Sequence, residues 1–194
     1  DADSAKRVLD AHAKEDRAAV RAVAEDERVD AWVVCERLLA SGAPDAAVAL
    51  ATITADERLP PYVEWRKAHP LPDSAWETLD AVVALRKARK LKDARERLKG
   101  AGLPERGVLG SALLRQRIFL TPQAQEALAL GKRSAAEARS IGWSRGERSA
   151  LMASMERAHV LKKPRQVVAL GPQVLELLGT TGNRGARHHV HGRL

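Results

Sequence analysis

The chain has one cysteine, Cys35, among its 194 residues, so no disulfide can form within it. This excludes the disulfide-rich secreted proteins and gives no positive sign of an oxidising compartment. It also lacks an apolar run of about 18 residues, the length that a membrane-spanning helix needs. Its start, Asp1-Ala2-Asp3, has neither an initiator Met nor a signal-like stretch, which suggests a fragment of a longer polypeptide. We therefore expect a cytoplasmic location.

Aromatic and β-branched residues are scarce. There are four Trp, one Tyr and one Phe, whereas Ala, Leu, Arg, Glu and Lys dominate the sequence. These are strong helix formers. The length suits either one compact domain of about 150 residues or an array of about five helical hairpins. The composition therefore predicts an all-α protein.

Charge is unevenly distributed. The net charge is +8, but residues 1–102 hold 18 Lys/Arg against 19 Asp/Glu, while residues 103–194 hold 15 against 6. A basic half can indicate a polyanionic partner such as nucleic acid. Arginine-rich, solvated helix faces give the same asymmetry without any such partner, and we favour that interpretation.

Two short motifs recur at nearly fixed intervals. The dipeptide Arg-Gly appears at residues 106, 145 and 184, each 39 residues apart, and Ala-Leu-Gly appears at residues 129 and 169. Periods of roughly 34 to 47 residues with two helices each are typical of helical-hairpin solenoids, in which no unit buries its apolar face alone. We therefore expect an α-solenoid of about four to five hairpins.

The apolar spacing predicts where the helices lie. Residues 4–24 should form one long helix or two short ones, and residues 54–73, which are rich in proline, an irregular connection or a single packed helix. Turns are expected at residues 41–44, 121–122 and 162–164, and the last nine residues should begin a truncated hairpin. We expect residues 1–27 to be N-terminal capping helices and residues 28–194 to be the repeat array.

The segment Ile141-Gly142-Trp143-Ser144-Arg145-Gly146-Glu147-Arg148-Ser149-Ala150-Leu151 resembles the linker of tetratricopeptide (TPR) repeats of about 40 residues. Bacterial repeats of this type are similar to those found beside caspase-like CHAT peptidase domains or nucleotide-binding regulator domains. In the family, a small residue midway along the first helix and an alanine early in the second lie where the two helices touch. The resemblance places Cys35 and Val82 at the first kind of position, and Ala47, Ala94, Ala127 and Val167 at the second. Gln116 and Met155 stand at the small position in the last two units.

The resemblance also implies a ligand-binding surface. In this family the first helices line a concave groove that holds an extended or helical peptide. The residues carried over to that groove are Trp32, Glu36, Val83, Arg86, Gln116, Glu156 and His159. They form a mixed, partly basic set.

Residues with catalytic or metal-binding chemistry have simpler explanations. Cys35 could be a thiol nucleophile, but it lies on an apolar helix face and is interpreted as a packing residue. His188, His189 and His191 lack further ligands at metal-site spacing and are interpreted as a surface cluster. The four tryptophans are spread too widely for base stacking, so most should pack in the core. We expect no enzyme activity, cofactor or metal.

The sequence thus predicts a non-enzymatic protein- or peptide-binding scaffold or sensor, part of a larger bacterial regulatory protein. Two alternatives remain. The basic second half would suit a nucleic-acid-binding repeat module, whose affinity would fall steeply with salt. The resemblance also allows a regulatory fragment of a TPR-CHAT peptidase.

Overall fold

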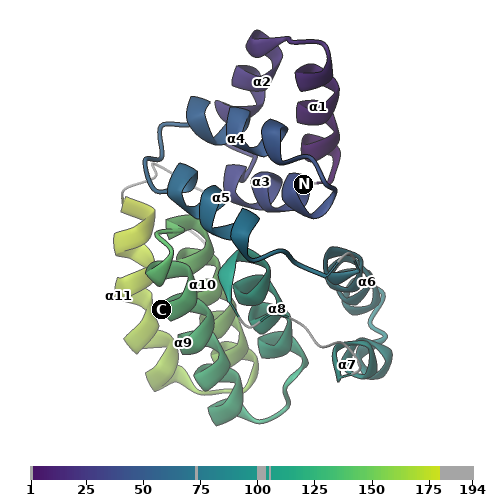
Figure 1. The fold of residues 1–194 in the computed structure, drawn as a ribbon. Helices are drawn as coiled ribbons and strands as arrows, with labels where there is room; N and C mark the ends of the chain where they lie inside the picture. Colours follow the sequence, from purple (N-terminus) through teal and green to yellow (C-terminus); the bar gives the residue numbers. More distant parts are fainter. Residues whose placement is uncertain (1, 73, 100–103, 105, 180–194) are drawn as a thin grey trace. The chain divides into compact units, whose positions relative to one another are not determined.

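The computed structural model describes residues 2–72, 74–99, 104 and 106–179, and the secondary structure within these ranges is entirely α-helical (Figure 1). This confirms the all-α prediction. The helices are α1 (Ala2–Ala13), α2 (Arg17–Ala24), α3 (Ala31–Ala40), α4 (Pro44–Ile53), α5 (Leu59–Ala68), α6 (Ala75–Lys87), α7 (Leu91–Lys99), α8 (Gly107–Leu120), α9 (Ala124–Ser140), α10 (Ser144–Val160) and α11 (Pro164–Gly179).

The chain divides into two compact units, Asp1–Glu77 and Thr78–Leu194. In the first unit, α1 and α2 pack on α3 and α4, and α5 packs on α3 and α4. Residues 4–24 form two helices rather than one, and the proline-rich segment contains the single helix α5. The residues expected as a cap are thus a helical hairpin that packs on the next one. The truncated last hairpin and the three C-terminal histidines lie outside the described residues.

The helix pairs are joined by one recurring kind of turn. At its centre stands a residue with positive φ, whose N–H bonds to the carbonyl three residues back, while the next N–H bonds to the carbonyl five residues back. This pattern satisfies carbonyls that the helix end leaves unpaired. The next helix begins two residues after the centre in every case. The central residues are Glu15, Gly42, Arg89, Gly142 and Lys162.

Four of these turns belong to hairpins with the same internal register. In each of the four, an apolar buried residue stands seven positions before the turn centre on the first helix and another stands five positions after it on the second, whereas at the turn centred on Gly142 the later position holds the charged Glu147. None of these eight packing residues is more than 3% exposed. In chain order, the sets are Val8, Glu15 and Val20; Cys35, Gly42 and Ala47; Val82, Arg89 and Ala94; and Met155, Lys162 and Val167.

Proline or aspartate stands at the start of three of the four second helices. Pro44 and Pro164 open α4 and α11, where a missing N–H has no helical partner to lose. Asp16 precedes α2, and its Oδ1 accepts a hydrogen bond of 2.9 Å from the N–H of Ala19. Such a cap stabilises a helix by about 1 kcal/mol. The turns and the starts of these helices therefore reinforce each other.

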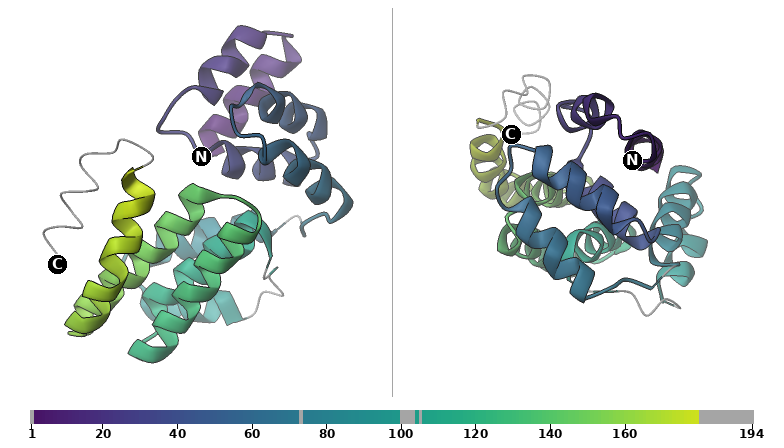
Figure 2. Two further views of the ribbon diagram at one scale, coloured as in Figure 1. Left: turned by 90° about the vertical axis from the view of Figure 1, so that its left-hand side faces the viewer. Right: turned by 45° about the horizontal axis from the view of Figure 1, so that its top comes forward.

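In the second unit, α8 to α11 lie alongside one another, with direct contacts between successive helices and between α8 and α10 (Figures 1 and 2). Small residues on α9 allow its neighbours to come close. The hydroxyls of Ser111 on α8 and Ser134 on α9 donate to each other's backbone carbonyls, at 3.0 and 2.9 Å. On the other side, a Cβ added to Gly131 would lie 1.7 Å from the Oγ of Ser154 on α10. A larger side chain at Gly131 would force α9 and α10 apart.

The connection between α8 and α9 departs from the common turn. Thr121 is extended there, with φ −84° and ψ 124°, and Pro122 follows it. The corresponding packing residues, Gln116 and Ala127, are both buried but stand one position closer together than in the other hairpins. The turn predicted at Thr121-Pro122 is therefore present, with its own geometry.

The Arg-Gly motif does not mark equivalent positions. Gly107 opens α8 with φ 81°, a conformation that favours glycine, and its N–H donates to the Glu137 carboxylate at 2.7 Å. Gly146 lies inside α10, where an added Cβ would come within 2.0 Å of the Trp143 ring. Arg184 lies outside the described residues. The register of the turns, rather than the 39-residue interval, relates the hairpins to one another.

The turn geometry allows a prediction for the stability of a variant at Lys162, where φ is 55°. Lys162→Gly should raise the free energy of unfolding by about 0.5–1 kcal/mol, because glycine adopts this conformation without strain. Urea denaturation would measure the change. The control is Lys163→Gly, which adds the same flexibility to the unfolded chain at a residue whose φ is not positive. Equal effects of the two substitutions would contradict the role assigned to the turn.

Candidate functional site

The groove residues predicted in the first unit, Trp32 and Glu36, are both buried within it. Trp32 is 5% exposed, and its indole N–H donates to Asp56 Oδ2 at 2.8 Å. Glu36 is fully buried on the same helix, α3. Their polar atoms are thus engaged inside the unit, where they hold α3 to its neighbours.

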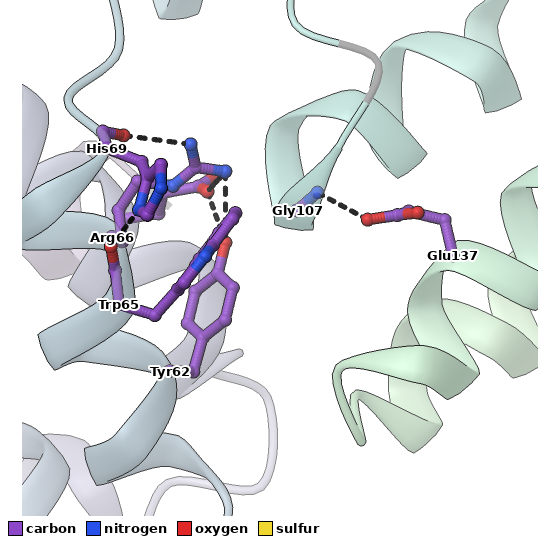
Figure 3. A network of polar contacts seen from close by, with 7 residues as sticks. Tyr62, Trp65, Arg66, His69, Gly107 and Glu137 are labelled. Carbon is purple, nitrogen blue, oxygen red and sulfur yellow. Dashed lines mark hydrogen bonds and ion pairs between the residues drawn. The ribbon is translucent and has the colours of Figure 1, made fainter.

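Glu36 forms a buried ion pair with Arg66 of α5. Arg66 Nη2 lies 2.7 Å from Glu36 Oε1, and the Tyr62 hydroxyl donates to the same carboxylate oxygen. Arg66 Nη1 also donates to the backbone carbonyl of His69 at 3.1 Å (Figure 3). Burial disfavours the charge on Arg66, but the Glu36 carboxylate and the Tyr62 oxygen outweigh it and raise the arginine pKa. The network therefore fixes a charged guanidinium inside the first unit.

Aromatic rings extend this network along α5. The Tyr62 ring lies 5.0 Å from the Trp32 ring and 5.6 Å from the Trp65 ring, and Trp65 stacks on His69 at 4.9 Å. The guanidinium of Arg66 lies 4.6 Å from the centre of the Trp65 ring, a cation–π distance (Figure 3). The set links α3 to α5 by packing as well as by charge. Trp32 and Tyr62 are buried, Trp65 is half-buried and His69 is exposed.

The groove residues of the second unit form one close contact. Arg86 on α6 donates through Nε to Gln116 Oε1 on α8 at 3.0 Å, and its guanidinium lies 4.6 Å from the Phe119 ring centre. Gln116 is buried, whereas Arg86 and Val83 are half-buried. The structure thus brings Arg86 and Gln116 together.

Glu156 and His159 lie further along, on α10. Glu156 is half-buried and His159 is exposed near the end of that helix. Since α10 packs directly on α8, Glu156 and Gln116 belong to neighbouring helices. The continuous groove that would join all seven residues stays a prediction, because two of them belong to the other unit.

Cys35 has the environment of a packing residue. It is fully buried, and its Sγ lies 3.5 Å from the backbone carbonyl oxygen of Ala47 on α4. Burial, and to a smaller extent the charge of Asp30, raises the pKa of the thiol above its usual value. A protonated, enclosed thiol is a poor nucleophile. Three of the four tryptophans, Trp32, Trp76 and Trp143, are also buried, which agrees with the core packing expected for most of them.

Sequence reasoning missed two arginines that hold the end of α8. Arg95 of α7 donates to the Leu120 carbonyl at 2.7 Å, and Arg157 of α10 donates through Nε to the Thr121 carbonyl at 3.1 Å. Burial, and then repulsion from Arg95, lowers the pKa of Arg157. Positive charge at a helix C-terminus is favourable. The basic composition of the second half was the only sign of this concentration of cations, and it did not point to Arg95.

Neither a metal centre nor a membrane span is found in the part of the chain that the structure describes. That part holds no group of three or more His, Cys, Asp or Glu side chains placed to share a metal ion. None of the helices in the described ranges is both long and apolar enough to cross a bilayer. Comparisons with protein-family models, curated proteins and solved structures give no match.

The buried ion pair makes a testable claim about stability. Glu36→Gln should lower the free energy of unfolding by about 3–5 kcal/mol, because it leaves the Arg66 charge buried without its counter-charge. Urea denaturation followed by tryptophan fluorescence would measure it. Glu64→Gln is the control, since Glu64 pairs with Lys67 at the exposed surface of α5, the helix that carries Arg66. That change should stay within about 0.5 kcal/mol. Losses of equal size would contradict the assigned role.

Proposed function

We propose that this chain is a non-enzymatic binding module for a protein or peptide, built from TPR-like helical hairpins. The observation that carries the proposal is the recurrence of one hairpin register four times, in both units, with all eight packing residues buried. Hairpins that each bury one face against the next leave their outer surfaces available for ligands. A cytoplasmic location and a place within a larger bacterial regulatory protein belong to the same proposal.

The distribution of polar contacts supports a binding rather than a catalytic role. The most enclosed polar groups of the described residues, such as Glu36, Arg66 and the Ser111–Ser134 pair, hold helices together. Cys35, the only cysteine, is inside the packing between α3 and α4. In the second unit, Glu156 is half-buried and His159 is exposed on α10, so both side chains offer charge or hydrogen-bonding capacity to a ligand.

A charge swap on the groove helices tests the proposal. The module and its Arg86→Glu/Glu156→Arg variant would be immobilised and exposed to a nuclease-treated extract of the source cells, and the retained proteins identified. We expect the swap to lower the amount of specifically retained protein about tenfold, since it reverses the direction of the charges on this surface. Circular dichroism would verify that the variant is folded.

The control is Arg165→Glu/Glu176→Arg on α11, which likewise exchanges one positive and one negative charge, here at exposed positions, and keeps the net charge unchanged. It should retain the same proteins as the parent chain. Equal retention by the two swapped variants, or no specific protein on any of them, would refute the proposed function. Binding of purified nucleic acid to the parent chain, with an affinity falling steeply with salt, would instead support the nucleic-acid-binding alternative.

A further inference from the structure

A hollow of about 650 Å³ lies in the second unit where the end of α7, the end of α8 and the start of α9 meet. Four of the residues that line it are basic, namely Arg95, Lys99, Arg117 and Arg133, and one is acidic, Glu126. Cations gathered around a concave surface produce a local positive potential. The hollow is therefore suited to a negatively charged ligand.

The basic side chains of this hollow differ in the hydrogen bonds and ion pairs that they make within the chain. Arg95 uses its Nε on the Leu120 carbonyl, and Lys99 forms an exposed ion pair with Glu96 at 3.1 Å. Arg117 is half-buried, and its guanidinium has no hydrogen-bond or ion-pair partner among the residues that the structure describes. A partly enclosed guanidinium presents a planar fork of donors that matches a carboxylate. Arg117 is thus the centre of the site.

The floor of the hollow is apolar. Leu98, Leu120 and Leu130 line it and are each at most 9% exposed, and the exposed Pro122 lines it as well. None of the lining residues is aromatic, so the hollow offers no platform on which a nucleic-acid base could stack. An apolar floor with a basic rim matches an aliphatic side chain flanked by carboxylates.

The helix ends around the hollow favour the same ligand. The last carbonyls of α8, at Leu120 and Thr121, already accept hydrogen bonds from Arg95 and Arg157, so the negative end of that helix is compensated. α9 begins at the hollow, and the side chain of its N-cap residue, Gln123, makes no capping hydrogen bond. The positive end of α9 therefore adds to the four side-chain cations.

We propose that the hollow lined by Arg95, Lys99, Arg117 and Arg133 binds an acidic peptide segment, with an aliphatic side chain on the leucine floor and carboxylates on the rim. This inference rests on the proposed function and adds to it the place and the chemistry of one ligand. Neither Arg86 nor Glu156 lines the hollow, so variants of the two surfaces can be compared.

The test uses the whole chain and a short fluorescein-labelled peptide that alternates glutamate and leucine. Fluorescence anisotropy should show saturable binding, which Arg117→Glu weakens roughly five- to tenfold because an attraction becomes a repulsion. Lys99→Glu is a second variant at an exposed position of the rim, and it should weaken binding in the same direction even if Arg117→Glu disturbs the fold. Arg165→Glu on α11 is the control with the same change of net charge and should bind nearly as the parent chain does.

Three results would overturn the proposal. One is no binding of the glutamate–leucine peptide, and another is equal weakening by Arg117→Glu, Lys99→Glu and Arg165→Glu, which would indicate a general effect of charge. A third is tighter binding of a thymidine oligonucleotide of equal charge, which would assign the hollow to nucleic acid. If Arg117→Glu and Lys99→Glu do not change peptide binding while the Arg86/Glu156 swap removes retention of proteins, the proposal for the hollow is wrong and the proposed function stands.

Discussion

The described structure depends on how each helix ends. The last carbonyls of a helix lack partners, and a residue in the left-handed conformation lets its own N–H and that of the next residue turn back and satisfy two of them. Five connections use this arrangement, although only Gly42 and Gly142 are glycines at its centre. Because the next helix always begins two residues later, the turn also sets the register in which the paired helices pack. The buried residues seven before and five after the centre follow from that geometry in four hairpins.

Much of this was readable from the sequence, and the remainder has physical reasons. Helix-forming composition predicted the all-α class, and Gly42 with Pro44 marked a turn through their backbone preferences. The turns at Glu15 and Arg89 contain neither glycine nor proline, so nothing in the sequence indicated their geometry. A residue other than glycine can adopt a positive φ there because hydrogen bonds and the packed helices hold it. The Arg-Gly repeat did not identify equivalent positions, because its two glycines are required for different reasons. Gly107 has a positive φ, whereas Gly146 lies too close to the indole ring of Trp143 for a larger side chain.

The candidate site was harder to predict than the fold. The groove residues were predicted from a resemblance that places first-helix residues at a surface. Whether such a residue is buried depends on which other helix packs against it, and a local sequence pattern does not give that information. Glu36 lies against α5, whose Arg66 and Tyr62 supply its partners from 30 and 26 residues away. Charge alone therefore does not identify a ligand site here. In the first unit a charged pair serves stability, whereas in the second unit the cations around the α7–α9 hollow remain at the surface.

In the proposal made here, these hairpins use their buried polar groups for packing and the cations around the hollow for a ligand. Nuclear magnetic resonance tests it most directly, by following the amide signals of the ¹⁵N-labelled chain while a glutamate–leucine peptide is added. The shifted signals should cluster in the last turns of α7 and α8 and the first turn of α9, around Arg117, while the indole signal of Trp32 stays in place. Shifts centred on Trp32 and Tyr62, or spread evenly over both units, would contradict it.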